Sequence, residues 1–322
     1  MRVLVTGGAG YLGSVLLPRL IAENHDLRVV DSLMYTGDSL LPLWAHPRFE
    51  FLRGDLRDPV TVRAAVEGVD AVVHLAAIVG DPACSRVPDE ARRVNLEASL
   101  SLLEEASKAG ARRFVFASTC SNYGRMADPD GYVDETAELR PVSLYAETKV
   151  GVERAILEQH AGDGILATSL RFATLFGVSP RMRFDLTVNE FTMELLTKRA
   201  LVVFGEQFWR PYVHIKDAAA AIVRVLDAPA KLVDREVYNV GSTAMNYQKQ
   251  QLVQMIVPLV PDAAIEYVHR EEDPRDYRVS FAKIENRLGF KAEQTVEGGI
   301  REVAALVEAG IITDYSEARY RN

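Results

Sequence analysis

Short apolar runs alternate with longer amphipathic stretches along the first half of the chain. The apolar runs have the length and the β-branched or aromatic composition of buried strands, and they cover residues 2–5, 27–31, 49–53, 71–77 and 113–119. Apolar residues recur at helical spacing in segments between or after them, at residues 11–23, 89–109 and 143–160. Strands that alternate with helices indicate parallel strands joined by right-handed crossovers. The pattern therefore predicts an α/β protein with a doubly wound parallel sheet.

A glycine-rich turn links the first predicted strand to the first predicted helix. It contains the pattern G-x-G-x-x-G, in the strand–turn–helix context that dinucleotide binding requires. Gly7 allows a tight turn, Gly10 lets the backbone approach a pyrophosphate, and Gly13 lets the helix pack closely on the strand. Backbone N–H groups at the start of the helix then face the diphosphate. The sheet is therefore predicted to be of the Rossmann type.

Asp31 ends the second predicted strand. A carboxylate at this place accepts hydrogen bonds from the 2′-hydroxyl of a ribose, and its charge repels a 2′-phosphate. The predicted cofactor is therefore NAD rather than NADP.

Composition argues against several classes of partner. The chain has 322 residues and a formal net charge of −8, which disfavours nonspecific binding to nucleic acid or to an anionic membrane. No apolar run is long enough to span a membrane, and few apolar residues precede Gly7, which argues against a signal peptide. Cys84 and Cys120 are too few for a disulfide framework. We expect a cytoplasmic protein without nucleic-acid or membrane partners, and no metal site is predicted.

Tyr145 and Lys149 lie four residues apart and share one face of a predicted helix. An ammonium group beside a phenol lowers the pKa of the phenol, so Tyr145 is a candidate proton donor and acceptor at a carbinol oxygen. Ser118 and Thr119 end the preceding strand with hydroxyl groups where a substrate oxygen would lie. The four-residue spacing alone is typical of an ordinary amphipathic helix, but after a nucleotide-binding half it indicates an active site.

With these features the chain resembles the nucleotide-sugar epimerase/dehydratase family of the extended short-chain dehydrogenases/reductases, over nearly its whole length. Besides the glycine-rich turn and Tyr145-x-x-x-Lys149, the matching pieces are Gly54-Asp55-Leu56, His74-Leu-Ala76-Ala77, Asn95, residues 118–124, Arg171-Phe-Ala-Thr174, and residues 210–217 and 238–241. The resemblance implies that Thr119, Tyr145 and Lys149 form a catalytic triad. It also implies an NAD site made of Gly7, Gly10, Tyr11, Leu12, Gly13, Asp31, Asp55, Leu56, Ala76, Ala77, Asn95, Ser118, Tyr145 and Lys149.

The resemblance further implies how a nucleotide-diphosphate sugar is held. Asn189, Arg210 and a further arginine, for which we favour Arg275, would bind the substrate diphosphate. The remaining candidate substrate-binding residues are Cys120, Ser121 and Thr174. Residues 78–84 and the basic stretch 179–185 are the expected determinants of sugar specificity.

The chain departs from the family pattern directly after Thr119. The 4,6-dehydratases of the family carry an acidic pair there, which they need to expel water, whereas this chain has Cys120 and Ser121. The departure disfavours dehydration. Cys120 is either a packed side chain or an added acid/base. Side chains alternate along a strand, so if Thr119 faces the crevice then Cys120 faces the core, and we favour packing.

The length exceeds that of a typical domain, so a large domain with a smaller appendage is expected. Residues 1–177 are predicted to form the NAD-binding Rossmann domain. Residues 178–322 mix short strands with helices and are predicted to form mainly a smaller C-terminal substrate-binding domain, with some segments returning to the Rossmann sheet. The polar tail after Ile312 is expected to be loosely held.

The predicted function is that of an NAD-dependent nucleotide-sugar epimerase. Tyr145 takes the proton of a ring hydroxyl, a keto-sugar forms transiently, and the hydride stays on the cofactor until it returns to the other face. The alternatives within enzymes are a nucleotide-4-ketosugar reductase and a nucleotide-sugar dehydrogenase/decarboxylase. A non-catalytic dinucleotide-sensing protein is the alternative from another class. We expect a homodimer.

Overall fold

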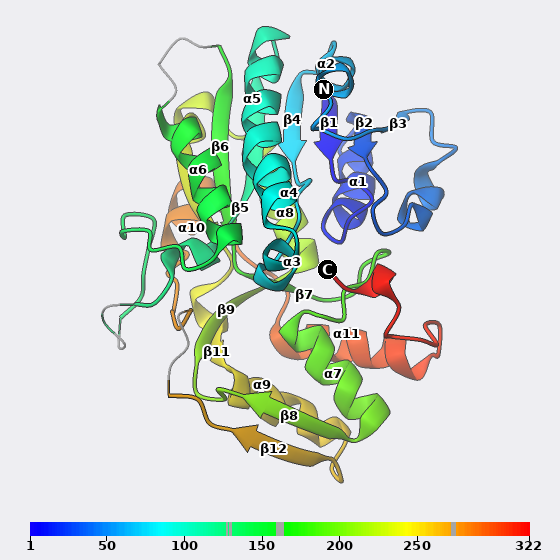
Figure 1. Ribbon diagram of the computed structural model, residues 1–322, viewed down its shortest axis with the longest axis vertical. Coiled ribbons are helices and arrows are strands. Elements are labelled where there is room, and N and C mark those ends of the chain that lie inside the picture. The colour runs from blue at the N-terminus through cyan, green and yellow to red at the C-terminus, as the bar shows by residue number, and fades with distance from the viewer. Residues whose placement is uncertain (127, 129–130, 159–163, 272–274) are drawn as a thin grey trace.

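Seven strands form the central sheet of a computed structural model that describes residues 1–126, 128, 131–158, 164–271 and 275–322. They span Arg2–Thr6 (β1), Asp26–Asp31 (β2), Phe49–Arg53 (β3), Ala71–His74 (β4), Arg113–Thr119 (β5), Leu166–Phe172 (β6) and Glu236–Val240 (β10). Their order across the sheet is β10-β6-β5-β4-β1-β2-β3, and every pairing is parallel (Figure 1). The chain winds outward in both directions from β1 and β4, which confirms the predicted doubly wound sheet.

Helices cover both faces of this sheet. On one face lie α1 (Gly13–Ala22) and α8 (Ile215–Asp227), and on the other lie α2 (Pro59–Val66), α5 (Ala98–Lys108) and α6 (Leu144–Glu158). Alternate residues of β1 serve the two cores: Val3 and Val5 pack towards α1, and Leu4 packs towards α2 and α5. Because both faces are covered, most strand positions are buried, except in the edge strand β3.

The helix predicted over residues 89–109 is interrupted. It consists of α4 (Pro88–Arg92), a π-helical turn at Arg93–Glu97, and α5. Asn95 lies in the π turn, and its side chain accepts a hydrogen bond from the amide of Ile78 (2.8 Å) and donates one to the carbonyl of Ile78 (2.9 Å). The π turn thus holds the segment that follows β4. This strand ends at His74, whereas the sequence predicted that it would continue to residue 77.

The last third of the chain adds a second core below the sheet in the view of Figure 1. A three-stranded sheet contains β7 (Thr174–Phe176), β9 (Trp209–His214) and β11 (Asn246–Gln248), and a parallel pair contains β8 (Ala200–Phe204) and β12 (Ala264–Val268). The surrounding helices are α7 (Thr187–Lys198), α9 (Lys249–Ile256) and α11 (Val296–Glu308). Two shorter helices lie elsewhere, α3 (Asp81–Arg86) and α10 (Ala282–Leu288). The domain boundary at residue 177 stays a prediction.

The expectation of a loosely held tail is wrong. The ring of Phe184 meets the rings of Tyr315 and Tyr320 edge-on, with centroids 5.0 Å and 5.9 Å away. The amide of Phe184 donates a hydrogen bond to the carbonyl of Tyr320 (2.9 Å). Aromatic contacts therefore dock a segment whose overall composition is polar. Within the described part of the chain, no helix combines the length and the apolar character that crossing a membrane requires.

Candidate active site

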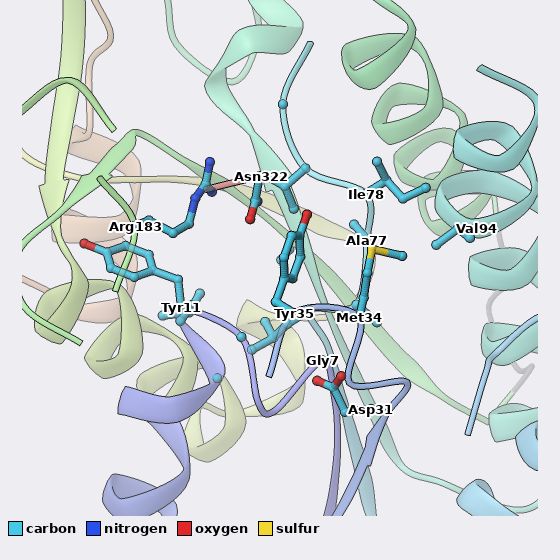
Figure 2. A pocket seen from close by; sticks show the side chains of 18 of the residues that line it. Gly7, Tyr11, Asp31, Met34, Tyr35, Ala77, Ile78, Val94, Arg183 and Asn322 are labelled. Atoms are coloured by element: carbon cyan, nitrogen blue, oxygen red, sulfur yellow. The ribbon is translucent and has the colours of Figure 1, made fainter. Parts of the chain in front are cut away.

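A cavity of about 350 Å³ opens at the carboxyl ends of the central strands (Figure 2). This is where a doubly wound sheet binds its ligands, next to the point at which the strand order reverses. Most of the predicted site residues share its wall, namely Gly7, Gly10, Tyr11, Leu12, Gly13, Asp31, Asp55, Leu56, Ala76, Ala77, Ser118, Thr119, Ser121, Tyr145, Lys149 and Thr174. The fold thus brings the glycine turn and the Tyr145–Lys149 pair, which are far apart in sequence, to one cavity.

The glycine turn has the shape that a diphosphate site needs. Gly7 has a φ of +72°, and a Cβ at this position would lie 2.7 Å from the Ala76 amide nitrogen. A Cβ at Gly13 would lie 2.5 Å from the carbonyl oxygen of Gly7, so only glycine lets α1 start this close to the turn. The amides of Ser14, Val15 and Leu16 donate to the carbonyls of Gly10 and Leu12, so the N–H groups that can face a diphosphate are those of residues 11–13, which line the cavity. These residues fit the diphosphate of NAD.

Asp31 is held in place at the end of β2. Its carboxylate accepts hydrogen bonds from the amides of Ala9 (3.0 Å) and Leu33 (2.8 Å). Burial raises the pKa of this carboxyl, while the two amide hydrogen bonds and the charge of Arg181 act in the opposite direction. The remaining lone pairs of the carboxylate fit the hydroxyl groups of the adenosine ribose.

We expect NAD to bind at least about tenfold more tightly than NADP, because a 2′-phosphate beside Asp31 would be repelled. Asp31→Asn keeps an oxygen acceptor and removes the charge, so it should narrow this preference without abolishing NAD binding. Titration of the protein with both cofactors, followed by fluorescence quenching, measures the ratio. Equal affinity of the unaltered protein for the two cofactors would contradict the assignment.

Lys149 is buried at the inner end of the cavity. Its ammonium donates a hydrogen bond to the carbonyl of Ala117 (2.8 Å) and lies 4.7 Å from the ring centroid of Phe116. Burial lowers the pKa of Lys149 to about 8. The ammonium also lies 5.8 Å from the ring centroid of Tyr145.

The pKa of Tyr145 differs from the expectation. Burial raises it, and the cation that opposes this effect is Arg183. Lys149 was expected to lower the pKa of Tyr145 towards neutrality, but its ammonium is turned to the Ala117 carbonyl. The four-residue spacing places both side chains in the wall, yet the strongest opposing charge comes from a segment far away in sequence.

The chain turns sharply after Thr119. The Thr119 hydroxyl oxygen accepts a hydrogen bond from the amide of Ser121 (3.1 Å), and a short 3₁₀ helix follows at Cys120–Tyr123. Ser121 lies in the cavity wall. Cys120 is only 1% exposed, packs in the core, and donates from Sγ to the carbonyl of Arg171 (3.2 Å). Burial raises the pKa of this thiol, so the structure favours packing rather than contact with a substrate.

Cys120→Ala is therefore expected to lower the free energy of unfolding by about 1 kcal/mol and to leave turnover nearly unchanged. Urea denaturation and steady-state rates of the variant measure the two effects separately. A hundredfold loss of turnover with an unchanged melting temperature would show that the thiol takes part in the reaction.

Two predicted residues lie behind the wall rather than in it. Asn95, expected at the cofactor, instead fixes Ile78, which lines the cavity. Asn189, expected at the substrate diphosphate, accepts a hydrogen bond from the amide of Gly177 (3.0 Å) and donates to the carbonyl of Arg183 (2.9 Å). Both amides are fully buried and satisfied by backbone groups, so in this structure they shape the wall without reaching the cavity.

The two predicted diphosphate-binding arginines also lie outside the wall. Arg210 donates to the carbonyl of Trp209 (2.7 Å), and its guanidinium lies 5.7 Å from the ring centroid of Tyr277, which does line the cavity. Arg275 forms an ion pair with Asp81 (2.9 Å). Arg210 therefore lies beside a residue of the wall, whereas Arg275 is paired with Asp81, which follows Gly80 of the wall.

Sequence reasoning missed several residues of the wall, among them Tyr35, Arg181, Arg183, Tyr277 and Asn322. The basic stretch 179–185 was visible, but it was assigned to sugar specificity rather than to a place beside Asp31. Tyr35 lies in the connection after β2. No sequence pattern distinguishes Asn322, whose position depends on the docking of the tail.

The chain is similar to known proteins over most of its length. The curated UDP-glucose 4-epimerase of Corynebacterium glutamicum is 30% identical over 313 residues, and the alignment covers 92% of each chain. The structure of a UDP-glucose 4-epimerase from Thermus thermophilus in complex with NAD is 26% identical, with 97% of this chain and 100% of that chain covered and a TM-score of 0.83. A dTDP-glucose 4,6-dehydratase from Streptomyces venezuelae, solved with NAD, is 28% identical, with coverages of 96% and 98% and a TM-score of 0.85.

These similarities confirm the predicted fold and the NAD cofactor, and they support an epimerase ahead of the reductase and decarboxylase alternatives. The sequence also matches, over residues 3–241, a model of the family described as "NAD dependent epimerase/dehydratase family". That match includes the glycine turn, Asp31 and the Tyr145–Lys149 pair, which the fold gathers at one cavity. We conclude that the chain is an enzyme of the NAD dependent epimerase/dehydratase family.

Proposed function

We propose that this enzyme inverts carbon 4 of a hexose carried on UDP. The similarity to UDP-glucose 4-epimerases over most of both chains supports the substrate class. The observation that carries the reaction type is the chemistry of the wall around Tyr145. Among the described wall residues, the side-chain carboxylates are those of Asp31, which ends β2, and Asp55, which follows β3. Both strands lie on the far side of β1 from β5, and Asp55 is paired with Arg57. Expelling water from the sugar would need an acid that this wall does not supply.

The residues beside the sugar can manage a proton at its 4-hydroxyl. NAD bound in this cavity would accept a hydride from carbon 4 and return it to the other face of the sugar, which is the redox chemistry that inversion requires. Tyr145 takes the hydroxyl proton and gives it back, while the hydroxyl group of Thr119 holds the same oxygen in place. Arg183 opposes the effect of burial on Tyr145 and so favours the phenolate that this step needs.

We propose that Arg210 and Arg275 hold the substrate diphosphate from the last third of the chain. The positions of the two arginines support this proposal, because Arg210 lies over the ring of Tyr277 and Arg275 is paired with Asp81. Asn189 contributes by fixing the backbone of Gly177 and Arg183. A homodimer and a cytoplasmic location remain predictions from the sequence, and light scattering of the purified protein tests the dimer.

The test is product analysis with UDP-glucose, UDP-galactose and UDP-glucuronic acid. We expect NMR spectra to show the 4-epimer at unchanged mass, with no net accumulation of NADH. Release of CO₂ would establish the decarboxylase, and stoichiometric use of added NADH would establish the reductase. Tight NAD binding without turnover of any nucleotide sugar would favour the dinucleotide-sensing protein.

A further inference from the structure

Arg181 is a buried cation in the wall of the cofactor cavity that the proposed reaction does not use. The residue is 3% exposed, and its guanidinium stacks on the ring of Tyr35, 4.2 Å from the ring centroid. Nη2 donates to the carbonyl of Arg321 (3.1 Å) and to Oδ1 of Asn322 (2.8 Å). The stacking and the two hydrogen bonds fix the plane of the guanidinium before any ligand arrives.

The hydrogen bonds of Arg181 leave its charge uncompensated at close range. A guanidinium has five N–H donors, and the two acceptors that Nη2 uses are neutral amide oxygens. The Nε of Arg181 is buried and has no hydrogen-bond partner. Among the described residues, no carboxylate forms an ion pair with Arg181, whereas its neighbour Arg183 is paired with Asp185 (2.6 Å). Burying a charge without a partner is costly, so the arrangement points to an anionic ligand.

The location of Arg181 indicates which part of an anionic ligand it would bind. Arg181 is close enough to Asp31 for each charge to affect the pKa of the other. Arg181 donates to the side chain of Asn322, which Figure 2 shows across the cavity from Gly7. The glycine turn can bind only one side of a diphosphate with its backbone N–H groups. The other side then faces the segment that carries Arg181.

We propose that Arg181 binds the diphosphate of NAD from the side opposite the glycine turn. Arginine suits this task because its fork of N–H groups matches two phosphate oxygens. With the proposed function, on which this assignment rests, the enzyme binds two diphosphates, that of the cofactor and that of the nucleotide sugar. The nearness of Arg181 to Asp31 and Tyr35, which follow β2, assigns it to the cofactor.

Calorimetric titration of the cofactor-free protein with NAD, ADP and adenosine tests the proposal. Arg181→Met should weaken the binding of NAD and of ADP by roughly tenfold to a hundredfold, because a charge-assisted hydrogen-bonding partner is lost. Adenosine lacks the diphosphate, so its affinity should change by less than about twofold. Arg19→Met is the matched control, because Arg19 is an exposed arginine of α1 outside the wall. It should leave all three affinities unchanged.

A conservative variant and a second nucleotide complete the test. Arg181→Lys keeps the charge and loses the fork, so it should bind ADP with an affinity between those of the unaltered protein and Arg181→Met. If circular dichroism shows that Arg181→Met does not fold, the ratio of ADP affinity to adenosine affinity in Arg181→Lys tests the proposal instead. Binding of UDP to the NAD-loaded protein should be unaffected. Equal losses for adenosine and ADP, no loss for ADP, or a loss confined to UDP would each overturn the proposal.

Discussion

Replacing Tyr145 with phenylalanine is expected to lower turnover by about a thousandfold, because proton transfer by a positioned side chain contributes on the order of a hundredfold to ten-thousandfold. The substitution keeps the ring, which shares the wall with Lys149, and removes only the oxygen. Binding of NAD should therefore stay within about twofold of the unaltered protein. Single-turnover rates and NAD titrations of the variant measure the two effects independently.

Two further variants show whether the loss is specific. Tyr267→Phe removes the hydroxyl of an exposed tyrosine in β12 and should be without effect. Lys149→Met should lose turnover and also weaken NAD binding, because its ammonium lies inside the cofactor cavity. If Tyr145→Phe kept more than about a tenth of the activity, another residue would have to move the proton.

Replacing Glu153 with alanine is expected to destabilise the fold by roughly 3–5 kcal/mol, a large part of the 5–15 kcal/mol typical of a folded domain. Glu153 and Arg171 form an ion pair that is almost completely buried between α6 and β6. Arg171 also donates to the hydroxyl of Tyr123 (2.8 Å), and Glu153 accepts from the hydroxyl of Ser118 (3.1 Å). Without the carboxylate, the guanidinium of Arg171 would remain buried and unpaired.

Urea denaturation of three variants checks this prediction. Glu153→Gln keeps an acceptor for Ser118 and should cost less than Glu153→Ala. The double variant Glu153→Met with Arg171→Met removes both charges and should recover most of the lost stability, since replacing a whole buried pair is often nearly neutral. A loss below about 1 kcal/mol for Glu153→Ala would mean that water or another anion reaches Arg171.

The cofactor half of the site could be predicted because its geometry is local. The spacing of Gly7, Gly10 and Gly13 fixes a turn between one strand and one helix, and Tyr145 and Lys149 lie one helical turn apart. Neither arrangement depends on the rest of the chain. Cys120 is buried, as alternation from Thr119 predicted, although β5 ends at Thr119 and Cys120 begins a 3₁₀ helix rather than continuing the strand.

The remainder of the site depends on contacts between distant segments. Arg181 stacks on Tyr35, which follows β2, and donates to Asn322 in the tail, which packs on Phe184. Asn95 supports Ile78 through a π turn, and the apolar spacing of an uninterrupted helix gives no sign of such a turn. Periodicity describes which side of an element is buried, but not which other element covers it, so these residues could not be assigned from the pattern.

The position of β10 sets the order in which this protein can mature on the ribosome. β10 pairs with β6, and Asn239 within it accepts a hydrogen bond from the hydroxyl of Tyr123 (2.7 Å), so the sheet is complete only once residue 240 has left the exit tunnel. Until then, β6 presents an unpaired edge, which favours association with other nascent chains. Closing contacts over so long a stretch also slows folding. A fragment ending at residue 177 should therefore aggregate, and chaperones that shield strand edges should raise the yield of the whole chain.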